Sequence, residues 1–113
     1  MELLIVILNR EEYFEKIVSI LVEIGVTGAT ILDSQGLGNF LAYEVPIFAG
    51  LRKLVGENKS ANKTILAVLE DKSILSKFKQ LLVEEDIDFS HPGVGIVATL
   101  SVNEVVRPKR GNF

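Results

Sequence analysis

The chain has 113 residues, no cysteine and a formal net charge of −3 at pH 7. This length predicts a single domain over residues 1–113. The lack of cysteine excludes disulfides and thiol chemistry, and it agrees with a cytoplasmic location. No apolar run reaches the ~18 residues of a membrane span, and Met1-Glu2 lacks the basic residues of a secretory signal. The acidic balance argues against general binding of nucleic acid.

The first half of the chain has a strand-helix-strand pattern. Strands are predicted at residues 3–8 and 29–32, with an amphipathic helix between them. Asn9 and Glu12 resemble a capping box at the start of this helix, and Gly25 suits the position just beyond its end. The apolar stripe of the helix predicts burial in the core; it consists of Tyr13, Phe14, Ile17, Val18, Ile20, Leu21 and Ile24.

The second half repeats this pattern. Strands are predicted at residues 64–69 and 95–100, and Asp71 suits the N-cap of the helix between them. The helix again carries an apolar stripe that predicts core packing. A doubled strand-helix-strand of this length predicts an α+β, ferredoxin-like βαββαβ sandwich, with a four-stranded antiparallel sheet and both helices on one face.

The predicted strands do not alternate between apolar and polar residues, as a sheet with one solvated face requires. Residues 3–8 are all apolar, and residues 65–69 and 96–98 are apolar as well. Exposing such a face would cost on the order of several kcal/mol at roughly 25 cal/mol per Å². It would also form an apolar patch that soluble monomers avoid. We therefore expect a homo-oligomer whose copies pack through their sheets.

A long loop at about residues 37–61 separates the halves, and it greatly exceeds the ~4–6 residues typical of connections in compact domains. The loop is too apolar for plain disorder. A short helix is predicted to start at Pro46 and to end at Gly56. Two interpretations stay open: the loop docks its apolar side on a partner, or it folds back over its own assembly. The predicted partner contacts are Phe40, Tyr43, Ile47, Phe48 and Leu51.

Two glycine motifs flank strands, Gly36-Leu37-Gly38 after the second strand and Gly93-Val94-Gly95 before the last. Glycine adopts positive φ readily and lets the backbone approach a ligand. Backbone N–H groups that turn inward hold an oxyanion. One such motif is weak evidence, because hinges and bulges also use glycine, but two at matching places favour a phosphate site.

The C-terminal segment supplies positive charge. An arginine can bind a phosphate through two donors and a lysine acts as a point charge, so Arg107 and Lys109 are the expected phosphate contacts, with Arg110 as a substitute for Lys109. The alternative is a solvated basic tail. His91, the single histidine, has no partner at a spacing that predicts a metal site.

Gly28-Ala29-Thr30, the two glycine motifs and the basic pair Arg107 and Lys109 follow one another on the doubled frame. In this order they resemble the PII superfamily of signalling proteins (nitrogen regulatory protein P-II-like), as a divergent member. The resemblance implies a homotrimer that encloses its sheets and binds an adenine nucleotide, ATP, ADP or AMP, in the clefts between subunits. It implies that Thr30 hydrogen-bonds the adenine and that Ile7 packs on the base. It also implies a long loop that docks on a membrane transporter or metabolic enzyme.

Three positions depart from the family pattern. Phe40 stands where classical members have Gln, and Asn62, with Lys63 beside it, stands where they have Lys. In those members the two residues help to hold a metal-bound 2-oxoglutarate. Ile96 replaces a Lys that contacts phosphate. The departures argue against 2-oxoglutarate sensing and predict a weaker preference for triphosphate, and they leave a cyclic dinucleotide open as a ligand.

Catalysis finds little support in the sequence. The chain has no cysteine, no recognisable Ser-His-acid pattern and no Walker loop. We therefore expect a non-enzymatic signal-transduction protein without a cofactor. One alternative is a divalent-cation-tolerance-type or other ferredoxin-like trimer that binds metal or a small metabolite. Another is an obligate subunit whose apolar loop clamps a fixed partner.

Overall fold

The computed structural model of the chain describes residues 1–55 and 62–107. None of the helices in these two ranges is both long and apolar enough to cross a membrane. The elements in chain order are β1 Glu2–Leu8, the 3-10 turn η1 Glu11–Tyr13, α1 Phe14–Glu23, β2 Thr30–Ser34, α2 Leu37–Glu44, the 3-10 helix η2 Pro46–Leu51, α3 Arg52–Val55, β3 Asn62–Leu69, α4 Lys72–Glu84 and β4 Gly95–Ser101.

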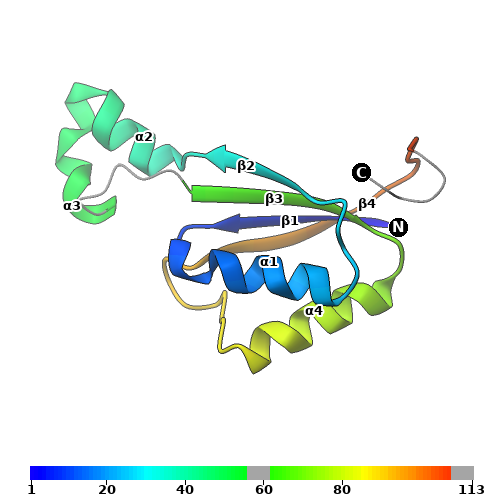
Figure 1. The fold of residues 1–113 in the computed structure, drawn as a ribbon. Helices are drawn as coiled ribbons and strands as arrows, with labels where there is room; N and C mark the ends of the chain where they lie inside the picture. The colour runs from blue at the N-terminus through cyan, green and yellow to red at the C-terminus, as the bar shows by residue number, and fades with distance from the viewer. Residues whose placement is uncertain (56–61, 108–113) are drawn as a thin grey trace.

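The four strands form one sheet in the order β2-β3-β1-β4, and every neighbouring pair is antiparallel. Helices α1 and α4 lie side by side against one face of this sheet (Figure 1). The architecture is the predicted α+β, ferredoxin-like βαββαβ sandwich.

The core lies between the sheet and these two helices. Leu4, Val6 and Leu8 of β1 are at most 1 % exposed, and Ile17 of α1 and Phe78 of α4 are fully buried against them. Burial of each such side chain contributes about 1.5–3 kcal/mol. The apolar stripes of both helices are therefore core, as their spacing predicted.

The two helices end in the same way. Gly25 follows α1 with φ +85° and Asp86 follows α4 with φ +56°. In both cases the next residue donates its N–H to a carbonyl in the last turn, which is the Schellman arrangement. These bonds join Val26 N to Leu21 O at 2.8 Å and Ile87 N to Leu82 O at 2.9 Å.

The two helices begin differently. Asp71 accepts a hydrogen bond from Ser73 N at 2.8 Å, which confirms it as the N-cap of α4. The capping box at Asn9 and Glu12 is wrong. The chain enters α1 through η1, which starts after Arg10 without a side-chain cap. The side chain of Asn9 instead accepts a hydrogen bond from Asn62 Nδ2 at 2.9 Å.

The other face of the sheet, which we call the open face, is covered by no helix within residues 1–55 and 62–107 (Figure 1). It is largely apolar, as the strand pattern predicted, and Ile96 and Leu100 are 58 % and 56 % exposed. Whether other copies cover this face stays a prediction. Its members, by strand register, are Leu3, Ile5, Ile7, Thr30, Leu32, Ser34, Asn62, Thr64, Leu66, Val68, Ile96, Ala98 and Leu100.

Residues 37–55 of the predicted long loop are helical apart from the extended Val45, and we call them the helical insertion. A helical segment does start at Pro46, as predicted, but α2 was not expected, and Gly56 lies outside the described residues. Arg52 Nε donates to Ala42 O at 2.9 Å, and its guanidinium lies 4.9 Å from the centroid of the Tyr43 ring. The insertion extends beyond the end of the sheet and does not lie across the open face (Figure 1).

Candidate functional site

The predicted ligand residues lie toward opposite ends of the sheet. The motifs Gly36-Leu37-Gly38 and Gly93-Val94-Gly95 lie where β2 ends and β4 begins, next to Leu8 of β1. Arg107 follows β4 at the other end, and Lys109 lies outside the described residues. The seven residues of β4 span about 20 Å at ~3.3 Å per residue. Within one chain, the two groups are therefore too far apart to hold the same phosphate.

Ile7 and Thr30 both lie on the open face. Ile7 is half-buried between Thr64 and Ile96, and Thr30 is exposed opposite Leu66. Their side chains thus project from the face that another copy is predicted to cover. This position agrees with a ligand held between copies, which stays a prediction.

The first glycine motif does not form the predicted nest of glycines with positive φ. Gly36 has φ −70° and is the residue before α2, and Leu37 and Gly38 lie in the first turn of that helix. Neither glycine has a positive φ. The first N–H groups of a helix have no intrahelical acceptor, and they carry a partial positive charge. Any anion contact here would therefore use a helix start in place of a glycine nest.

The second glycine motif has the positive φ angles that were predicted, +83° at Gly93 and +147° at Gly95. A Cβ at Gly95 would lie 2.0 Å from Ile7 O, so β4 can approach β1 only with glycine there. Val94 is 2 % exposed in the core, and its carbonyl accepts from Asn9 N at 2.9 Å. The motif thus has a structural purpose that is independent of any ligand.

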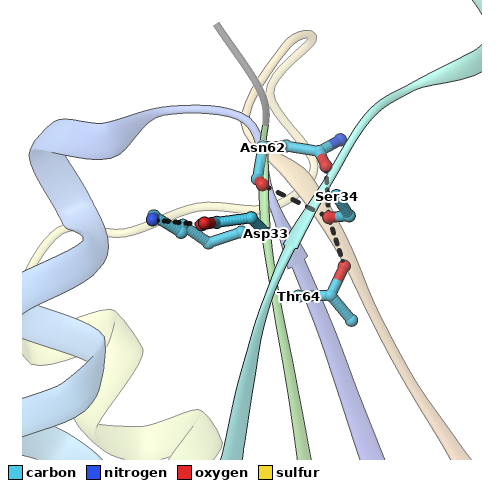
Figure 2. A network of polar contacts seen from close by, with 5 residues as sticks. Asp33, Ser34, Asn62 and Thr64 are labelled. Atoms are coloured by element: carbon cyan, nitrogen blue, oxygen red, sulfur yellow. Dashed lines mark hydrogen bonds and ion pairs between the residues drawn. The ribbon is translucent and has the colours of Figure 1, made fainter.

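A polar network ties together the strand ends at the base of the helical insertion. Figure 2 shows Ser34, Asn62 and Thr64 pointing toward one another. Ser34 Oγ lies 2.5 Å from Asn62 Oδ1 and 2.7 Å from Thr64 Oγ1. Asn62 Nδ2 then donates to Asn9 Oδ1, which brings the end of β1 into the same network. Asn62, the residue at the place of the family lysine, is therefore a neutral link between three strands.

Lys63, the neighbour of Asn62, makes its contacts on the other face of the sheet. It forms an ion pair with Asp33, its register partner across β2 and β3, and its Nζ lies 5.8 Å from the centroid of the Phe14 ring. The hydrogen bond from Lys63 to Asp33, together with the aspartate charge, raises the pKa of Lys63 above its ordinary value. Because Phe14 belongs to α1, Lys63 points toward the helices and away from the open face.

At the opposite end, Arg107 lines a cavity of about 400 Å³, which we call the Arg107 cavity. The side chain of Arg107 forms an ion pair with Glu70, just after β3. The sequence did not predict this pairing, because the two residues are far apart in the chain and follow no spacing rule. The other lining residues are Gly25, Val26, Thr27, Gly28, Val68, Ile74 and Val105.

Three of the predicted partner contacts are exposed on the helical insertion. Ile47 is 84 % exposed, and Phe40 and Phe48 are 44 % and 43 % exposed. Tyr43 and Leu51 are half-buried, with Arg52 over the Tyr43 ring. The insertion therefore presents apolar side chains outward, while Tyr43 contributes to its internal packing.

His91 lies in an exposed loop beside a second cavity of about 410 Å³. Its Nε2 is 3.7 Å from an oxygen of Asp88. Hydrogen bonds from Ser90 lower the pKa of Asp88 below its ordinary value. Within the described residues, no group of three His, Asp or Glu side chains is placed to hold a metal ion.

No family model matches the sequence, and no curated protein matches it. The structure is similar to the crystal structure of Arabidopsis thaliana PII bound to citrate, with a TM-score of 0.59. The match covers 98 % of this chain and 85 % of that chain, at 19 % sequence identity. At this identity the likeness establishes the fold, and the chain therefore has a PII-like fold.

Proposed function

We propose that the chain is a non-enzymatic signal-transduction protein that binds an adenine nucleotide between copies of itself. The observation that carries the proposal is the separation of the predicted ligand residues. The two ends of this PII-like sheet each carry part of the predicted phosphate site, and these parts would form one site only if two copies lay side by side. Such an arrangement also explains why Ile7 and Thr30 project from the open face.

The open face supports assembly as a homotrimer. Its exposed apolar side chains, Leu32, Ile96 and Leu100 among them, are stabilised when other copies cover them. In a closed ring the contact is head-to-tail, so that the Arg107 end of one copy meets the glycine end of its neighbour. Each trimer would then hold three equivalent nucleotide sites.

The helical insertion is the proposed output of the signal. Phe40, Ile47 and Phe48 give it an exposed apolar surface at the end of the sheet that carries the two glycine motifs. Gly36 begins α2 directly, so a ligand held at that helix start would act on the orientation of the insertion. We propose that this surface docks on a membrane transporter or a metabolic enzyme in the cytoplasm.

Calorimetry of the full chain against ATP, ADP, AMP and a cyclic dinucleotide tests the proposed ligand. We expect saturable binding of an adenine nucleotide and little gain from added 2-oxoglutarate. Substitution Arg107→Ala should weaken binding by about 1.5–3 kcal/mol, since a charge-assisted contact is lost. Lys79→Ala, which removes one exposed charge from α4, serves as the matched control.

Three results would count against the proposal. If calorimetry shows no binding heat with any nucleotide, the proposed ligand is wrong. If sedimentation analysis shows a monomer, the proposed site between copies does not exist. Tight cation binding without nucleotide would favour the divalent-cation-tolerance alternative.

A further inference from the structure

The Arg107 cavity already contains one negatively charged side chain, and a phosphate ligand would add further negative charge to it. Arg107 and Glu70 are the charged groups among its described lining residues, and they form an ion pair. Their side chains are 34 % and 57 % exposed, so both ions remain in contact with water. The pair is thus open to exchange with a dissolved anion.

A carboxylate and a phosphate compete for the same atoms of an arginine. The guanidinium offers a planar set of N–H donors that matches two oxygens of either anion. Because Glu70 already occupies Arg107, an incoming phosphate must displace the carboxylate or bind beside it. In either case the cost rises with the negative charge of the ligand, because like charges at short range repel.

We propose that Glu70 sets the specificity of the nucleotide site by competing with the ligand phosphate for Arg107. The carboxylate holds the guanidinium while the cavity is empty, and it disfavours a ligand in proportion to the negative charge that enters the cavity. The inference rests on the proposed function, because Arg107 must be a phosphate ligand. It gives a physical reason for a weak preference for triphosphate over monophosphate.

The test measures the affinities for AMP, ADP and ATP by calorimetry in the wild-type chain and in Glu70→Gln. The variant should tighten AMP binding about threefold and ATP binding about tenfold or more. The gain is larger for ATP because the removed carboxylate repels a ligand more strongly when the ligand carries more negative charge. These gains should shrink as salt is raised, since the charges are partly exposed. Glu84→Gln removes the same charge from the exposed end of α4 and should leave all three affinities within about twofold of wild type.

A double-mutant cycle separates competition from a general effect of charge. If Glu70 acts through Arg107, most of the gain from Glu70→Gln should disappear in an Arg107→Gln background. Glu70→Asp retains the charge and should keep the weak preference for ATP. Since Glu70 is more than half exposed, the variants should fold, which far-ultraviolet circular dichroism checks.

The outcomes distinguish this inference from the function on which it rests. Wild-type binding of nucleotides with affinities unchanged by Glu70→Gln would overturn the competition and leave the proposed function standing. An equal gain for AMP and ATP would overturn the discrimination by charge. If neither the wild type nor Glu70→Gln binds any nucleotide, the proposed function and this inference are both overturned.

Discussion

The two halves of the chain fold into the same strand-helix-strand unit, yet they use different residues at corresponding places. Helix α4 starts at a capping aspartate, whereas α1 starts through a 3-10 turn without a side-chain cap. Both helices end in a Schellman arrangement, with Gly25 in one half and Asp86 in the other. The glycine motif of the first half begins a helix, and that of the second half lets two strands approach. The same backbone geometry thus has several sequence solutions, and the same short motif has several structural uses.

The largest expected effect is the difference in lost stability between alanine substitutions in the two glycine motifs. Gly95→Ala should destabilise the fold by about 3 kcal/mol or more, because the new Cβ would collide with Ile7 O and the residue would keep a positive φ. Gly36→Ala, at φ −70° with its nearest neighbour 3.9 Å from the new Cβ, should cost less than about 1 kcal/mol. Urea unfolding of both variants checks the contrast. Equal losses of stability would mean that the motifs have the same structural use.

A smaller effect is expected where the two halves meet. Asn62→Ala should cost about 1–2 kcal/mol, because Ser34 and Asn9 lose a shared hydrogen-bond partner. Hydrogen exchange within residues 37–55 should rise, since the base of the helical insertion is loosened. The exposed Asn103→Ala is the control. If both variants exchange like the wild type, the network does not hold the insertion.

The helix ends offer a reciprocal exchange of residues. Asp86→Gly should stabilise the second half by about 0.5–1 kcal/mol, because glycine adopts positive φ without the penalty of a Cβ. Gly25→Asp should destabilise the first half by about 1 kcal/mol; a Cβ there meets nothing within 4 Å, so the cost is conformational. Thermal unfolding of both variants measures the pair. Shifts of the same sign would show that the two ends are not equivalent.

The smallest effect concerns acid and the N-cap aspartate of α4. Hydrogen bonds from Ser73 hold the pKa of Asp71 below its ordinary value of 3.8. The ionised aspartate therefore stabilises the native state above pH ~4, and this contribution is lost as pH falls through the lowered pKa. In Asp71→Asn, the dependence of stability on pH between about 4 and 2 should be weaker than in the wild type. Urea titrations across that range test this, and identical profiles would contradict it.

Much of the fold could be predicted because its signals are local. The apolar stripes, the cap at Asp71 and the turn at Gly25 lie within a few residues of the structure that they specify. The apolar character of both sheet faces could also be predicted. Successive side chains of a strand point to opposite faces, so an unbroken apolar run makes both faces apolar.

The features that were missed depend on contacts between distant residues. Helix α2 is packed through Arg52, which bonds a carbonyl ten residues earlier. Asn9 could not be placed correctly because its partner, Asn62, is 53 positions away. The pairing of Glu70 with Arg107 likewise has no local pattern. The candidate site was therefore only partly readable: the sequence singled out the two glycine motifs and Arg107, whose role in binding stays a prediction, and it gave no sign that Glu70 pairs with Arg107.

Arg52 of α3 bonds Ala42 O and lies over the Tyr43 ring of α2, so contacts inside the helical insertion contribute to its order. A partner protein would bind a segment that is already folded, so little conformational entropy of the insertion would be lost on binding. Under the proposed function, a ligand bound at the sheet would change the orientation of the helical insertion as a whole, and no segment of it would have to fold or unfold.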